Sequence, residues 1–318
     1  MTAIDFLSID LPAIFVAVLA ATSCSLLGNF LVLRRQALIG DAISHAVLPG
    51  IVIGFLLAGT LSTLPLMLGA IGAAILAAGL IEALRQIGRI EAGAAMGVVF
   101  TTMFAAGIVL LEQAGASNVH IDAEHALYGS LESIIWMDLT VWMDLFTLDA
   151  YAGMPRHLVT LIGVTFSIVA LVFLFFKELK VATFDPDLAV SIGLPMQKIS
   201  TGFIVLVAVA AVASFEAVGS ILVIAMFICP AATARMLTDK LSRQLWISAG
   251  VATLAGVGGY LFAAFGPQLW GSSNSLNAAG AIAVVAGLLQ VMAMVAGPRY
   301  GALTRTIKKR KQRPASIY

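Results

Sequence analysis

Apolar runs long enough to cross a lipid bilayer recur along this chain, and they limit its fold more than any other feature. The hydrocarbon core of a bilayer takes about 20 residues of α-helix. We count nine such segments, near residues 12–33, 38–58, 62–82, 93–111, 158–176, 199–214, 217–235, 245–265 and 278–297. The sixth and seventh are short and nearly continuous at Ser214-Phe215-Glu216, so eight spans is an alternative. The pattern predicts an all-α integral membrane protein, a polytopic bundle of about nine transmembrane helices.

Composition supports this class. Hydrophobic residues make up 60% of the chain and charged residues only 11%, and the mean hydropathy is +1.02. A soluble domain carries about 25% charged residues, so this much apolar surface needs a membrane. The two cysteines, Cys24 and Cys229, both lie within apolar runs, which argues against a disulfide framework or a cysteine-based zinc site.

Basic residues indicate the orientation. With nine spans, all but one of the 18 Lys and Arg residues fall on one side, and Arg156 is the exception. Because basic loops stay cytoplasmic, we expect the N-terminus outside and the C-terminus inside. The chain then divides into a transmembrane domain, residues 1–297, and a basic cytoplasmic tail, residues 298–318. The tail fits anchoring to anionic lipid, and no other feature indicates nucleic-acid binding.

A polar pair stands inside the second apolar segment, in GDAISHAVLPG. Asp41 and His45 are four residues apart and would share one helix face. Such residues are costly in a membrane, and together they offer one oxygen and one nitrogen to a divalent metal. Taken singly, His45 could be a packed histidine and Asp41 a helix cap. Pro49 would free a backbone carbonyl near His45, which could be structural slack or a ligand.

Residues 112–157 form the longest external segment, and it is acidic. Two histidines and two carboxylates fall within six residues of it: His120, Asp122, Glu124 and His125. One interpretation is an outer gate or vestibule that gathers cations. The other is a solvated loop on the membrane surface.

Residues 177–198 form the main internal loop, which contains the pattern of a short helix. Asp185 and Pro186 are typical of a helix start, and Gly193 of its end. Its apolar residues available for contact are Leu188, Val190 and Ile192. The helix could bind a cytosolic partner, or the loop could simply happen to be helical.

Three segments taken together resemble a known family: GDAISHAVLPG, FDPDLAVSIGL and ASFEAVGSILVIAMFICPAATARM. They look like stretches of the membrane permease subunits of zinc/manganese/iron ABC uptake transporters. The resemblance runs over residues 11–297. A further segment, NVHIDAEHALYG, is similar to one in the manganese/iron branch of that family.

The resemblance implies a permease that pairs with a second permease subunit, as a homodimer or heterodimer, in the bacterial cytoplasmic membrane. It also implies two copies of a cytosolic ABC ATPase and an extracytoplasmic metal-binding protein. Asp41 and His45 would bind the transported metal, and Asp185–Gly193 would be the coupling helix that docks on the ATPase. The chain has no GxxxxGK[ST] phosphate loop, so the ATP site would belong to the partner.

The transported ion remains open at this stage, and no permanently bound cofactor is expected. An oxygen–nitrogen pair suits Mn(II) or Fe(II), whereas zinc prefers more histidine or cysteine. Manganese is the leading expectation, with zinc or iron as alternatives. Two other classes are alternatives: a proton-coupled secondary metal transporter, and a membrane metalloenzyme, for which no HExxH motif exists.

Overall fold

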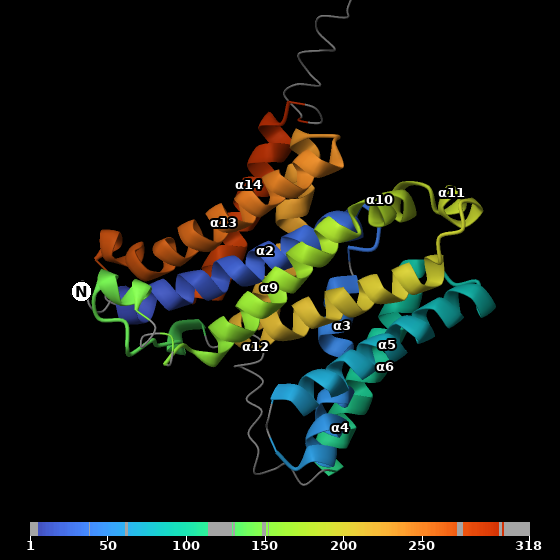
Figure 1. Cartoon of the computed structure of the whole chain (residues 1–318), viewed down its shortest axis with the longest axis horizontal. Coiled ribbons are helices and arrows are strands. Elements are labelled where there is room, and N and C mark those ends of the chain that lie inside the picture. The colour runs from blue at the N-terminus through green and yellow to red at the C-terminus, as the bar shows by residue number, and fades with distance from the viewer. Residues whose placement is uncertain are drawn as a thin grey trace, which may run out of the picture.

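The computed structural model describes residues 6–37, 39–60, 63–113, 129, 131–147, 151, 153–271, 276–298 and 301. Every regular element in these ranges is helical (Figure 1). The α-helices are α2 (Leu11–Leu33), α3 (Ile39–Ala46), α4 (Leu48–Ala58), α5 (Thr63–Ile87), α6 (Ala92–Gln113), α9 (Arg156–Leu174), α10 (Phe176–Phe184), α11 (Pro186–Ser191), α12 (Met196–Leu237), α13 (Leu241–Phe265) and α14 (Ala278–Ala296). A π-helical turn, η1 (Phe6–Asp10), and three 3₁₀ turns, η3 (Leu131–Ser133), η4 (Trp142–Phe146) and η5 (Pro267–Trp270), complete them.

Within those ranges, seven helices are long and apolar enough to cross a membrane. The prediction of an all-α, multi-pass membrane protein is therefore confirmed. Six of the nine predicted segments correspond to single long helices: α2, α5, α6, α9, α13 and α14. The other three correspond to one broken segment, α3 with α4, and to one long helix, α12.

The helices form two groups that meet at α12. In the first group, α2 packs against α9, α12 and α13, and α14 packs against α12 and α13. The second group contains α3, α4, α5 and α6, of which α3 and α5 pack on α12 (Figure 1). Small residues permit the close approaches: a side chain at Gly28 on α2 would collide with the carbonyl of Phe227 on α12. Small residues at helix interfaces are what membrane helices use to pack closely.

The predicted span over residues 38–58 is a broken helix. The α3 helix ends at Ala46 and α4 begins at Leu48, with Pro49 in its first turn. Proline fits that position because the N–H groups of a first turn have no partner within the helix. The α3 and α4 pieces have 8 and 11 residues, so neither could cross a bilayer alone.

The α12 helix runs for 42 residues but is interrupted at Gly219, whose φ of 77° and ψ of 166° are not helical. The limbs before and after it run in different directions in Figure 1, yellow and then orange. We expected a break at Ser214–Glu216, and the structure places it three residues later. Ser214–Glu216 stay helical, because the backbone geometry at which the helix breaks is open essentially only to glycine.

Replacing Gly219 with alanine is expected to destabilise the protein by about 1–3 kcal/mol, because alanine is strained at this backbone geometry. Thermal unfolding of the purified protein in detergent measures the effect. Gly163→Ala on α9 is the matched control, since a Cβ there meets open space and the glycine has no positive φ. An equal loss in both variants would contradict the role assigned to Gly219.

Gly129, Glu132 and Trp136 of the expected external segment connect elements at one end of the bundle. The Trp136 N–H donates to the Ser8 carbonyl at 2.8 Å, and the Glu132 carboxylate accepts from the Ala278 N–H at 3.0 Å. The backbone of Gly129 packs against Val218 at the α12 break. The N-terminal turn, the start of α14 and the α12 break therefore lie at the same end.

Candidate metal transport site

The α3 helix, which carries Asp41 and His45, lies between α12 and α6. A Cβ at Gly40 would come within 2.9 Å of Cδ2 of Phe227, so a glycine lets α3 approach α12. Ala42, Ile43 and Ala46 are also buried. Close packing thus fixes this short helix inside the protein rather than at its surface.

The imidazole of His45 is packed by two aromatic rings of α6. Its ring centroid lies 5.0 Å from that of Phe100 and 5.5 Å from that of Phe104. Phe100 and Phe104 are four residues apart and so stand on one face of α6. Sequence reasoning missed them, because their spacing shows only that they share a face of α6 and not that α3 packs there. Two rings on one side limit the orientations that the imidazole can adopt.

The predicted partner of His45 is described only in its backbone. Asp41 lies one turn before His45 on the continuous helix α3, as the spacing predicted, but its side chain is outside what the structure describes. The described side chains contain no group of three or more His, Cys, Asp and Glu residues suited to a metal. Metal binding by Asp41 and His45 therefore stays a prediction.

The helix break lies directly beyond His45. Pro49 has no N–H, so the usual helical bond to the carbonyl of His45, four residues earlier, cannot form. The break packs on α6, where a Cβ at Gly107 would lie 2.9 Å from Leu48 and 3.0 Å from Pro49. The break therefore lies next to the candidate ligand, inside the bundle.

The predicted outer gate falls outside the described residues. His120, Asp122, Glu124 and His125 all belong to the range 114–128. Their role stays a prediction.

The predicted short helix in the internal loop is present as α11. The Asp185 carboxylate accepts from the Leu188 N–H at 2.9 Å and so caps its start, with Pro186 in the first turn. Gly193 closes the end with a φ of 83°, and the N–H groups of residues 193 and 194 bond back to the last turn. This is the glycine-terminated helix end that the sequence indicated.

The α10 and α11 helices project from the rest of the molecule (Figure 1). Four apolar side chains are exposed on and beside them: Phe184, Leu188, Val190 and Ile192. Val190 is 63% exposed. An apolar surface on a projecting element is suited to a protein partner. The docking role itself stays a prediction.

Arg34, just after α2, connects α10 to the bundle. Its Nε–H donates to Thr183 Oγ1 at 3.1 Å, and its guanidinium lies 4.7 Å from the ring centroid of Phe203 on α12. Burial lowers the pKa of Arg34. Through this residue, the projecting arm is attached to the two most central helices.

Helices that can span a membrane, with an interior helix broken beside a polar residue, are features of membrane transport proteins. The chain belongs to the ABC 3 transport family, whose model matches residues 7–297.

Individual relatives match over most of their length. The chain is 38% identical to the manganese transport system membrane protein MntD of Bacillus subtilis, covering 96% of this chain and 99% of that protein. It is 36% identical to the zinc transport system membrane protein TroD of Treponema pallidum, covering 94% of this chain and 77% of that protein. Among solved structures, PsaBC from Streptococcus pneumoniae in complex with Fab matches with a TM-score of 0.71 and 28% identity, over 94% of both chains.

Proposed function

We propose that the chain is the permease subunit of an ABC importer that moves a divalent transition metal, manganese first, into the cytoplasm. The observation that carries this proposal is the nearly full-length similarity to a manganese transport membrane protein. The similarity to a zinc transport membrane protein keeps zinc as an alternative, and iron remains a further one. A proton-coupled secondary transporter is the alternative from another class.

Asp41 and His45 form the proposed transport site. One oxygen and one nitrogen cannot complete a metal shell, so further ligands come from carbonyls, water or a second permease subunit. A transport site must also release its ion, which an incomplete protein shell favours.

The proposed topology has nine spans, with the N-terminus outside and the C-terminus in the cytoplasm. The two limbs of α12 count as two spans that meet at Gly219 on the outer side. Support comes from the outer end, where Gly129 of the acidic external segment packs on Val218 beside that break. At the opposite end, Gly297 lies near the carbonyl of Met236, next to Arg235 and ahead of the basic tail. Basic residues gather at the cytoplasmic side of membrane proteins.

The proposed partners follow the path of the ion. An extracytoplasmic binding protein delivers it, and His120, Asp122, Glu124 and His125 form an outer gate. Two copies of a cytosolic ATPase dock on the α11 arm and supply the ATP site. The chain itself, residues 1–297, spans the bacterial cytoplasmic membrane, and the tail, residues 298–318, binds lipid rather than nucleic acid. ATP binding moves the arm and opens the site inward.

A transport assay tests the proposal. The permease is expressed with its ATPase and binding protein in cells that lack other manganese uptake, and accumulated metal is measured. We expect Mn(II) to accumulate even with excess Zn(II), and uptake to stop when the ATPase is inactivated. Uptake that survives an inactive ATPase but collapses with a proton uncoupler would favour the secondary transporter. Preferential accumulation of zinc would overturn the choice of manganese.

A further inference from the structure

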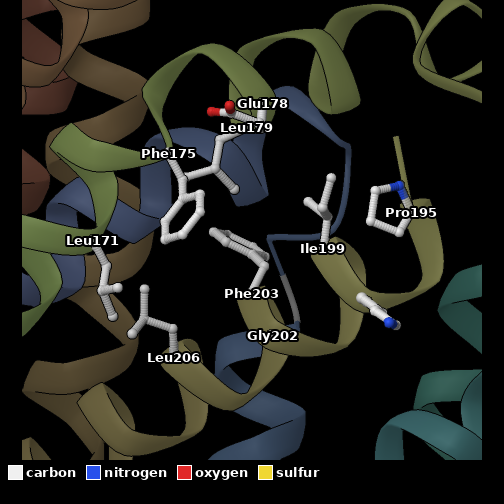
Figure 2. Close-up of a pocket in the computed structure, with 10 residues that line it drawn as sticks. Leu171, Phe175, Glu178, Leu179, Pro195, Ile199, Gly202, Phe203 and Leu206 are labelled. Carbon is white, nitrogen blue, oxygen red and sulfur yellow. The ribbon is translucent and has the colours of Figure 1, made fainter. Parts of the chain in front are cut away.

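An apolar cavity of about 390 Å³ lies between two parts of the chain: the end of α9 with the start of α10, and the first limb of α12. Figure 2 shows the side chains that surround it, with those of Phe175 and Phe203 pointing toward each other. The cavity adjoins a second, shallower one and shares Leu171, Lys198, Gly202 and Leu206 with it. We call the two together the α9–α12 groove.

The groove has the length of one lipid leaflet. It follows α12 from Lys198 to Val209, which corresponds to a rise of about 16 Å along the helix. Half of the hydrocarbon core of a bilayer is about 15 Å. Leu171 and Phe175 on its walls are partly exposed. Its dimensions and apolar walls therefore suit an acyl chain that lies parallel to the helix.

Two opposite charges line the same cavity. Lys198 lies near the start of α12, at the end of the groove that is closer to α11. Glu178 projects from α10. Figure 2 shows the Glu178 carboxylate at the edge of the cavity above Leu179. Its Oε2 atom is buried and has no hydrogen-bond partner among the described residues. A buried carboxylate oxygen without a donor is costly, so a ligand that supplies an N–H is favoured here.

We propose that the α9–α12 groove binds one phosphatidylethanolamine molecule from the cytoplasmic leaflet. Its acyl chain lies along Leu171, Leu206 and Val209, its phosphate pairs with Lys198, and its primary ammonium donates to Glu178. The assignment of this lipid to the cytoplasmic leaflet depends on the proposed orientation of the chain in the membrane.

The pair of charges selects this headgroup over others. The phosphate of phosphatidylglycerol would pair with Lys198, but its glycerol hydroxyls could give Glu178 only a hydrogen bond from an uncharged donor. The quaternary ammonium of phosphatidylcholine has no N–H to donate. A primary ammonium beside a phosphate offers each of the two side chains a group of opposite charge.

Gly202 offers a way to fill the groove without disturbing the fold. It lines both cavities, and a Cβ there meets nothing within 4 Å. A leucine at this position would occupy the space of the acyl chain. Gly163→Leu on α9 is the matched control, because its Cβ also meets open space but the residue does not line the groove.

The test measures lipid retained by the purified full-length chain, using native mass spectrometry with phosphatidylethanolamine, phosphatidylglycerol and phosphatidylcholine of identical acyl chains. We expect the wild type and Gly163→Leu to retain one phosphatidylethanolamine, and Gly202→Leu to lose it. Glu178→Gln should weaken its retention by roughly tenfold or more, because a charge-assisted hydrogen bond is lost. Retention of phosphatidylglycerol should fall by much less, because its headgroup carries no ammonium to pair with the carboxylate.

Retention of phosphatidylethanolamine by Gly202→Leu would overturn the location. Equal retention of all three lipids by the wild type would overturn the headgroup. Both outcomes are measured without metal or ATP, so either would leave the proposed transport function standing.

Discussion

Replacing Asp41 or His45 with alanine is expected to reduce metal uptake by about 100-fold or more while the permease still assembles with its ATPase. The reason is the sparse protein shell: loss of even an outer-shell partner costs 10–100-fold in metal affinity or activity, and a direct ligand should cost at least as much. Uptake of manganese into cells, normalised to the amount of assembled complex, is the measurement.

Packing must be separated from ligation at His45, because its ring contacts Phe100 and Phe104. His45→Leu keeps an apolar side chain against those rings but removes both nitrogens, and we expect it to be as inactive as His45→Ala. His157→Ala on α9 is the matched control and should transport normally. Normal uptake by both Asp41→Ala and His45→Ala would remove these residues from the transport site.

Introducing a carboxylate at Val190 is expected to weaken binding of the ATPase by about 30-fold or more, the effect of losing an interface hot spot worth about 2 kcal/mol. Val190 is exposed, so Val190→Glu should not disturb folding of the permease. At an apolar interface the new charge would be buried without a partner, which is costly. Co-purification of the ATPase and permease-stimulated ATP hydrolysis both report the effect.

Val190→Thr is the control, because it keeps the branched shape without adding a charge. It should retain most of the binding. If Val190→Glu still assembles and still stimulates ATP hydrolysis, α11 is not the docking element.

Much of the fold could be predicted because each span is specified locally. A run of about 20 apolar residues has one solution in a bilayer, a helix that satisfies its own backbone. The break beside His45 followed from Pro49, and the α11 helix from Asp185 and Gly193. These residues act on their own backbone, so their effect is visible without knowing what surrounds them.

The misplaced α12 break shows where local signals end. Ser214–Glu216 are compatible with a turn in sequence, but they are equally compatible with a helix. Gly219 is the residue at which the helix breaks, and Val218 beside it packs on Gly129, about 90 positions earlier. Contacts between distant segments cannot be read from a short window of sequence.

Part of the candidate site could be predicted from the sequence, and part could not. Asp41 and His45 stood out because polar residues are rare in apolar segments. Phe100 and Phe104 did not, because aromatic residues in a membrane helix are ordinary and only the packing of α6 on α3 gives them a role. Glu178 and Lys198 were missed for a similar reason, since they line one cavity only when α10 folds beside α12.

The position of α3 between α12 and α6 determines how far the helices would have to move to release a bound ion. His45 and α6 belong to the same helix group, while α3 also rests on α12, so sliding that group along α12 would change the distances between the imidazole and α12. Metal–ligand distances are held to about ±0.2 Å. A displacement much smaller than a side chain would therefore be enough to release an ion held there. By the same reasoning, substitutions where α5 packs on α12 should alter metal affinity without touching the metal.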